Sequence, residues 1–159
     1  MEIRRLVSED VEAAWQINEH GLPGTGQVSQ EEMVDLLSLC ELPIGVFEEN
    51  SLLGFALCLL PRTRYASLNY AWFNQRYQEF LYVDRIAVGE DYRGQGIGTL
   101  LYQKVIEYAE QQSCSVAAEV NLKPPNPGSI RFHHLHNFTE IGVFEQNEKT
   151  VSMMLRTQA

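Results

Sequence analysis

The chain has 159 residues, of which 45% are hydrophobic and 21% are charged, values typical of one globular domain. Its formal net charge of −9 disfavours binding to the phosphate backbone of a nucleic acid. No apolar run approaches the roughly 18 residues of a membrane span, and the first ten residues lack the apolar core of a secretory signal. We therefore expect a single cytoplasmic domain over residues 1–159 that binds neither nucleic acid nor a membrane.

Two helices are predicted near the N-terminus by their first turns. Ser8 is followed by acidic residues at 9, 10 and 12, and Ser29 by acidic residues at 31 and 32, a pattern typical of a capped helix start. Pro43 ends the second helix, and apolar runs then predict a hairpin. The predicted elements are a strand over 3–7, helices from 8 to about 20 and from 29 to before 43, and strands over 44–48 and 52–60.

A long aromatic segment separates this hairpin from the next strand. Residues 61–77 are too many for a plain hairpin loop, and they include Tyr70, Trp72, Phe73 and Tyr77. We interpret the segment as a loop that decides substrate specificity, its rings forming an apolar or cation-binding wall. Packing of the same rings against the sheet or at a dimer interface is an equal alternative.

The rest of the chain completes a mixed fold. Apolar residues at 97, 101, 105 and 108 predict a helix over 97–112. The other predicted elements are strands over 79–88, 115–122, 138–145 and 150–155 and a short helix over 126–136. The whole order, β-α-α-β-β-β-α-β-α-β-β, predicts an α+β sandwich with a mixed, mostly antiparallel central sheet flanked by helices.

Cysteine and histidine spacing argues against a disulfide framework and a metal site. The chain has three cysteines, an odd number, and no two of them form a C-x-x-C pair; they are Cys40, Cys58 and Cys114. Cys58 and Cys114 lie in apolar segments, where we expect them to pack in the core. His133 and His136 could share one helix face, but no carboxylate stands at a supporting spacing. We therefore expect no metal.

A glycine-rich turn before the helix at 97 indicates a ligand-binding site. A strand runs into Arg93, and Gly94, Gly96 and Gly98 follow at alternating positions. Glycines at a helix start let backbone N–H groups approach a ligand, and the helix dipole favours phosphate there. No Lys-Ser or Lys-Thr follows as in a P-loop, and the third glycine comes one residue too early for a Rossmann motif. The turn therefore predicts a pyrophosphate or phosphate site of another kind, with an ordinary turn as the alternative.

Two motifs resemble the GNAT superfamily of N-acetyltransferases. The pattern R-x-x-G-x-G, present as Arg93, Gly96 and Gly98, resembles the loop that binds the pyrophosphate of acetyl-CoA. The predicted element order resembles that fold over nearly the whole chain. The family pattern N-x-x-[AS]-x-x-[FL]-Y-x-x-x-G-F is met downstream at Asn126, Ser129, Phe132, His133, Asn137 and Phe138.

The resemblance implies that acetyl-CoA is the cosubstrate and that its acetyl group moves directly to an amine in a ternary complex. It also implies that the strand before the glycine turn pairs with the pantetheine arm, and that a bulge opens this strand from its neighbour. The implied cofactor contacts are Ile86, Ala87, Val88, Arg93, Gly94, Gln95, Gly96, Ile97, Gly98, Thr99, Asn126 and His133.

Two positions depart from the family pattern. His133 stands where the family has a tyrosine whose hydroxyl lies near the thioester sulfur, and Asn137 stands where it has glycine. An imidazolium at His133 could protonate the leaving thiolate, because an ordinary pKa of about 6.5 suits a general acid. The alternative is a histidine that only contacts the cofactor or a backbone carbonyl.

The general base is absent from its usual family position, which aligns with Tyr82. Asp84, two residues on and on the same strand face, is the first candidate, and Glu119 on the following strand is the second. Asp84 could instead be a structural partner of Arg85. The residues expected to contact the substrate are Tyr70, Trp72, Phe73 and Tyr82.

Other functions stay open at this point. A non-catalytic domain that binds or senses acyl-CoA would use the same fold, and so would a transferase of another acyl group or one acting on a hydroxyl. The acidic composition favours an amine acceptor, either a small molecule or a peptide. The chain could also form a homodimer.

Overall fold

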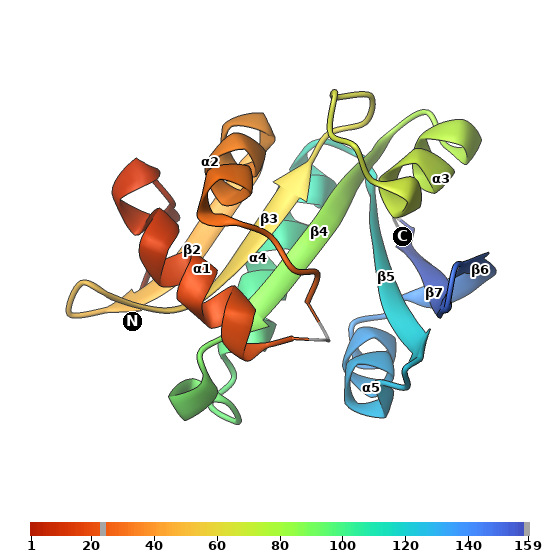
Figure 1. Ribbon diagram of the computed structural model, residues 1–159. Helices are drawn as coiled ribbons and strands as arrows, with labels where there is room; N and C mark the ends of the chain where they lie inside the picture. The colour runs from red at the N-terminus through yellow and green to blue at the C-terminus, as the bar shows by residue number, and fades with distance from the viewer. Residues whose placement is uncertain (23–24, 158–159) are drawn as a thin grey trace.

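The computed structural model describes residues 1–22 and 25–157, which form one seven-stranded sheet with helices on both faces (Figure 1). The strands lie in the order β1-β2-β3-β4-β5-β7-β6, and among them only the pair β4–β5 is parallel. The strands are β1 (Glu2–Arg5), β2 (Leu42–Glu48), β3 (Ser51–Leu59), β4 (Phe80–Val88), β5 (Ser115–Lys123), β6 (Thr139–Gln146) and β7 (Lys149–Arg156). The α-helices are α1 (Val11–His20), α2 (Gln30–Leu39), α3 (Leu68–Arg76), α4 (Ile97–Gln111) and α5 (Pro127–Leu135). The predicted α/β sandwich with a mixed sheet is confirmed.

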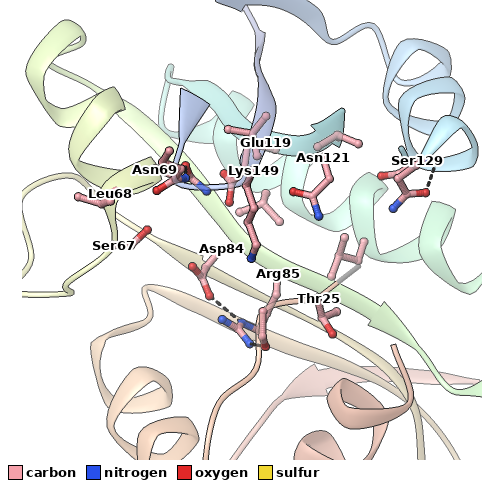
Figure 2. A pocket seen from close by; sticks show the side chains of 18 of the residues that line it. Thr25, Ser67, Leu68, Asn69, Asp84, Arg85, Glu119, Asn121, Ser129 and Lys149 are labelled. Carbon is pink, nitrogen blue, oxygen red and sulfur yellow. Dashed lines mark hydrogen bonds and ion pairs between the residues drawn. The ribbon is translucent and has the colours of Figure 1, made fainter. Parts of the chain in front are cut away.

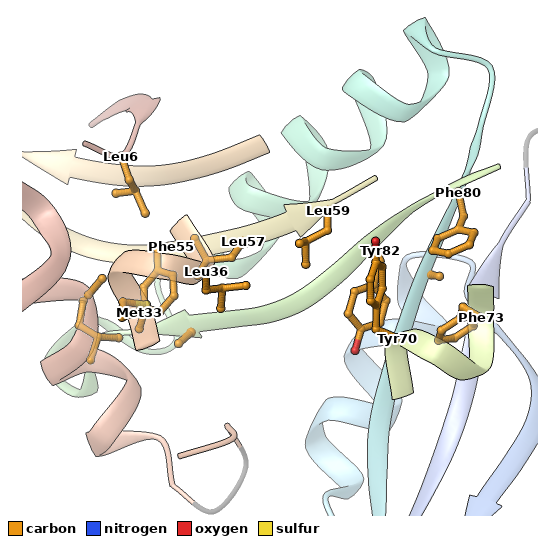
Figure 3. Close-up of a cluster of buried hydrophobic side chains, with 14 of the residues drawn as sticks. Leu6, Met33, Leu36, Phe55, Leu57, Leu59, Tyr70, Phe73, Phe80 and Tyr82 are labelled. Atoms are coloured by element: carbon orange, nitrogen blue, oxygen red, sulfur yellow. The ribbon is translucent and has the colours of Figure 1, made fainter. Parts of the chain in front are cut away.

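Two apolar clusters hold the helices against the sheet. α1, α2 and α3 cover one face, where Met33, Tyr70 and Phe73 pack with strand residues that include Phe55 and Tyr82 (Figure 3). α4 covers the other face and buries Ile97, Leu101, Tyr102, Val105 and Ala109. Each fully buried large apolar side chain contributes about 1.5–3 kcal/mol, so the sheet is a rigid frame for the site described below.

Helix α3 lies in the segment that the sequence predicts to be a loop, and the loop prediction is wrong there. The Ser67 side chain caps the helix by accepting a hydrogen bond from the Tyr70 N–H. Tyr70 and Phe73, three residues apart, both pack into the core, at 1% and 0% exposed. The aromatic and asparagine residues of this segment have weak helix propensity, so the burial of two rings on one helix face decides the conformation.

Candidate active site

A cleft opens in the middle of the sheet because its two central strands separate. β4 and β5 are paired only from Phe80 to Tyr82 on β4, opposite Ser115 to Ala117 on β5. Beyond Tyr82 the strands diverge (Figure 1), and within residues 1–22 and 25–157 no strand pairs with the β5-facing edge of β4 there. A cavity of about 870 Å³ lies at this divergence (Figure 2). Its walls come from β4, β5, α4, α5, the connections before α2 and α3, and the β6–β7 turn.

A β-bulge on β4 lies at the point of divergence. Leu57 of β3 pairs with Arg85, and the next residue, Cys58, pairs with Val83, so Asp84 has no partner on β3. The extra residue shifts the alternation of side chains along the strand. Asp84 and Arg85 therefore both line the cavity, where the Arg85 Nε donates to Asp84 Oδ2 at 2.7 Å. The bulge that the family resemblance implies in this strand is present.

The Asp84–Arg85 ion pair anchors the connection between α1 and α2. The two side chains are only 4% and 7% exposed. Arg85 also donates to Asn18 Oδ1 at 3.1 Å and to the Gly26 carbonyl at 2.9 Å. Asn18 Nδ2 donates to the same carbonyl at 2.9 Å. The Arg85 guanidinium thus holds three partners, and Asp84 is its counter-ion.

Glu119 on β5 faces the cavity and forms no ion pair with any residue that the structure describes. The Tyr82 hydroxyl lies 2.9 and 2.8 Å from its two carboxylate oxygens and donates to them. Burial and the nearby charge of Asp84 raise the pKa of Glu119 to about 8, although contacts with Tyr82 and Asn69 act in the opposite direction. A carboxyl group with a pKa close to neutral pH is suited to proton transfer.

A hydrogen-bonded tyrosine and histidine form another part of the wall. Tyr102 Oη on α4 lies 2.6 Å from His133 Nε2 on α5. His133 Nδ1 lies 2.8 Å from the Ser129 carbonyl, which can only accept, so Nδ1 carries the proton. Nε2 of the neutral ring therefore accepts from the Tyr102 hydroxyl. Burial lowers the pKa of His133, which favours this neutral form.

The glycine turn leads from β4 into α4. Gly94 and Gly96 have φ of +78° and +80°, a region that other residues rarely adopt, and a Cβ at either position would meet nothing within 4 Å. The backbone N–H groups of residues 96–99 have no acceptor in the described part of the chain. Free N–H groups at a helix start suit an anion. Gly98 serves packing as well, because a Cβ there would lie 3.2 Å from the Phe132 ring of α5.

The structure brings together the residues predicted to act in catalysis. His133, Asp84 and Glu119 all line the cavity. Two of the predicted cofactor contacts, Ile86 and Asn126, line it with them. The other predicted cofactor contacts lie outside the wall, at the end of β4 and the start of α4; they are Ala87, Val88, Arg93, Gly94, Gln95, Gly96, Ile97, Gly98 and Thr99.

The aromatic residues predicted to contact the substrate, Tyr70, Trp72, Phe73 and Tyr82, do not line the cavity. Tyr70, Phe73 and Tyr82 are core residues, at most 1% exposed. Trp72 packs over Gly142 of β6, where a Cβ would come within 2.8 Å of its ring. Helix α3 turns Tyr70 and Phe73 toward the sheet and presents Ser67, Leu68 and Asn69 to the cavity instead, while Tyr82 enters the same core from β4.

The sequence did not predict that three further residues would line the cavity. Tyr102 stands in the apolar helix α4 and meets His133 from 31 positions away. Asn69 opens α3, which the sequence did not predict, and it accepts a hydrogen bond of 2.6 Å from Gln146 Nε2. Lys149 follows the β6–β7 turn and lines the cavity from above in Figure 2. Their roles depend on contacts between distant elements.

Other reactive groups do not converge on a second centre. Within residues 1–22 and 25–157, no three His, Cys, Asp or Glu side chains gather as metal ligands, and no helix is long and apolar enough to cross a membrane. Burial raises the pKa of the Cys40 thiol to about 12 and that of Cys58 well above its ordinary value. Neither thiol is therefore a nucleophile at neutral pH.

Comparisons with known proteins agree with this geometry. The family model described as Acetyltransferase (GNAT) family matches residues 11–138. No curated protein matches the chain. Ard1 from Thermoplasma volcanium has a TM-score of 0.78 at 20% identity, over 98% of this chain and 95% of that chain. The ribosomal-protein-S18-alanine N-acetyltransferase from Escherichia coli has a TM-score of 0.73 at 18% identity, over 99% and 95%. A chain of the NatC complex bound to Gag peptide and CoA has a TM-score of 0.74 at 16% identity, over 100% of both chains.

Proposed function

Because the chain belongs to the acetyltransferase (GNAT) family, we propose that it transfers the acetyl group of acetyl-CoA to a primary amine by direct attack. The observation that carries this proposal is Glu119. It is a carboxyl group with a pKa of about 8, and it faces the cavity between the separated strands β4 and β5. An amine must lose a proton as it attacks a thioester, and a base poised near neutral pH can take that proton.

Glu119 suits the role of base better than Asp84, the first candidate from the sequence. Asp84 is held by Arg85 at 2.7 Å, and this pair also fixes the α1–α2 connection. A proton on Asp84 would break the ion pair that anchors this wall. Glu119 is held only by neutral groups, so its gain and loss of a proton leave the surrounding contacts in place.

Tyr82 is expected to tune this base. The hydrogen bond from its hydroxyl favours the charged carboxylate, so Tyr82→Phe should raise the pKa of Glu119 further above 8. The midpoint of the pH–activity profile should move upward, with CoA affinity unchanged. Tyr70→Phe is the matched control, because its hydroxyl donates to the Leu60 carbonyl and not to Glu119. An unshifted midpoint in Tyr82→Phe would argue against Glu119 as the titrating group.

The part of the cleft next to β4 and the start of α4 suits two polar parts of coenzyme A, the amides of its pantetheine arm and its pyrophosphate. The β5-facing edge of β4 beyond Tyr82 has no strand partner among the described residues, so its backbone can pair with the amides of the pantetheine arm. The unpaired N–H groups of residues 96–99, at the start of α4, suit the pyrophosphate, and Arg93 stands beside them as an exposed cation. Ile86 and Asn126 line the cavity between these two parts of the site.

His133 is proposed to contact the cofactor and not to act as an acid. Both ring nitrogens are engaged, with Ser129 and Tyr102, and burial lowers the pKa of the ring. His133→Ala should therefore weaken CoA binding by about 10-fold, since it removes a ring that lines the cavity and that holds Tyr102 in the same wall. The activity of the unmodified protein should show no loss as the pH rises through the lowered pKa of His133.

Titration of CoA binding and a pH–rate profile check this role. His134→Ala is the control, because His134 is exposed on the same helix and does not line the cavity. A fall in kcat of the order of 10²–10⁴-fold in His133→Ala, with unchanged CoA affinity, would restore the acid role.

The experiment for the proposed function is turnover of acetyl-CoA with a broad panel of amines, read by release of free thiol and by the mass of the product. We expect thiol release that depends on an amine and a product heavier by one acetyl group. Tight CoA binding without acetylation of any amine would support the non-catalytic alternative. The carboxyl group of Glu119, which is suited to act as base, favours catalysis over that alternative.

A further inference from the structure

The charged side chains of the cavity leave one cation without a partner. Asp84 and Arg85 neutralise each other. Lys149 reaches from the β6–β7 turn into the cavity, with its amino nitrogen toward Asp84 and Arg85 (Figure 2). It forms no hydrogen bond or ion pair with the residues that the structure describes. Lys149 and its neighbour Glu148 are therefore the charged groups of the wall without an ion-pair partner among the described residues, whereas the Glu119 carboxyl group is held by hydrogen bonds from Tyr82.

The charge of the cavity differs from that of the whole chain. The chain carries −9, which would attract polycations from solution. Besides Glu119, the charged side chains of the wall are Asp84, Arg85, Glu148 and Lys149, whose formal charges cancel. With a pKa of about 8, Glu119 is mostly neutral at pH 7. The wall therefore offers a polyamine no net attraction.

Two walls of the cavity, from α3 and β6, are tied together by a hydrogen bond. Gln146, before the β6–β7 turn, donates to Asn69 at the start of α3 at 2.6 Å. Across the cavity, Arg85 and Asn18 hold the Gly26 carbonyl. Amide groups of Asn69, Asn121 and Gln146 line the space between. Amide side chains on walls held in place can bind a short polar molecule by hydrogen bonds.

We propose, on the premise of the proposed function, that the acceptor is a free amino acid or a similarly small zwitterion. Its amine lies at Glu119, and its carboxylate lies at the Lys149 ammonium. In the transfer, the amine nitrogen forms a bond to the acetyl carbon and the carbon–sulfur bond breaks. The ammonium group of the zwitterion first releases one proton to solvent. The second proton, lost as the amine attacks, passes to the ionised form of Glu119 and then to solvent, and the sulfur takes a proton from solvent.

The test compares free amino acids, the amides of the same amino acids, and 1,4-diaminobutane as acceptors. The amide keeps the amine and lacks the anionic group, and the diamine replaces that group with a cation. We expect kcat/KM for the best free amino acid to exceed that of its amide by about 10-fold or more, the factor of one charge-assisted contact. Lys149→Gln should raise the KM of the amino acid by a similar factor, leave kcat close to its original value and remove the preference over the amide.

Two further variants distinguish a direct contact between Lys149 and the acceptor carboxylate from a general effect of the charge of the protein. Lys123→Gln removes an exposed lysine on the neighbouring strand that does not line the cavity, and it should leave the preference intact. Lys149→Glu should make 1,4-diaminobutane the better acceptor. CoA affinity, measured in each variant, reports that the protein is folded.

The results that would overturn a free amino acid as acceptor differ from those that would overturn acetyl transfer to amines. Equal acetylation of amino acids and their amides, with Lys149→Gln without effect, would overturn the amino acid as acceptor and leave acetyl transfer to amines standing. A preference for amidated peptides would do the same. If no amine is acetylated although CoA binds, the proposed function is overturned, and the choice of acceptor with it.

Discussion

Glu119→Gln is expected to lower kcat by about 10²–10⁴-fold, the range for loss of a general base. Glutamine has nearly the same shape as a protonated glutamic acid and can still accept from the Tyr82 hydroxyl. The fold and the affinity for CoA should therefore be unchanged. The measurement is steady-state thiol release at saturating acetyl-CoA, with CoA binding determined separately.

The pH profile makes this expectation specific to Glu119. Activity of the unmodified protein should rise with pH through about 8, as the carboxyl group loses its proton, and then level off. The residual activity of Glu119→Gln should lack that rise. Glu145→Gln is the control, because Glu145 is an exposed carboxylate on β6 that does not line the cavity. A variant that keeps both the rate and the rise would exclude Glu119 as the base.

The raised pKa of Glu119 also makes stability depend on pH. The pKa of this group goes from 4.5 in an ordinary environment to about 8 in the folded chain. Its contribution to stability is therefore complete below pH 4.5 and is lost as the pH rises through 8. Glu119→Gln should consequently gain in Tm relative to the unmodified protein as the pH is raised from 4 to 9. A difference in Tm that stays constant over this range would show that the carboxyl group is not perturbed by burial.

Gly96→Val is expected to weaken CoA binding by about 10²-fold. The residue has φ of +80°, and nothing lies within 4 Å of the place where a Cβ would stand. That open space is where an anion would meet the N–H groups of the turn. Loss of two charge-assisted hydrogen bonds of about 1.5 kcal/mol each accounts for the factor. Isothermal titration with CoA measures it.

The change should reduce binding without unfolding the chain. A left-handed backbone costs a residue other than glycine about 1–2 kcal/mol, which is less than the 5–15 kcal/mol of a typical domain. Gly128→Ala is the control, because that exposed glycine of α5 lies outside the left-handed region and a Cβ there has room. Unchanged CoA affinity in a folded Gly96→Val protein would place the pyrophosphate elsewhere.

Local patterns predicted most of the fold. Ser29 forms the expected cap with Glu32, and the helix predicted over 126–136 is present as α5. The seven strands are read from apolar runs separated by turn residues, and those patterns are local. α3 was missed because its stability comes from packing of Tyr70 and Phe73 on the sheet, which no local propensity reveals.

A sequence motif predicted one part of the site, the glycine turn. The parts that depend on contacts between residues distant in the sequence could not be predicted. The turn at Gly94 and Gly96 could be predicted because glycine readily adopts the positive φ that both residues have. The choice between Asp84 and Glu119 depends on which carboxylate meets a cation, and the bulge that turns Arg85 toward Asp84 leaves no mark in the sequence. The pairing of Tyr102 with His133 depends in the same way on how α5 packs against α4.

The separation of β4 and β5 has a consequence for aggregation. A sheet that parts in its middle exposes interior strand edges in addition to its two outer ones, and an unpaired edge can recruit a strand from another chain. Proteins guard such edges with bulges and with charges that face inward. The Asp84–Arg85 bulge supplies both at the mouth of this gap. The features that shape the cleft for a ligand are therefore also ones that guard an exposed strand edge against pairing with a strand of another chain.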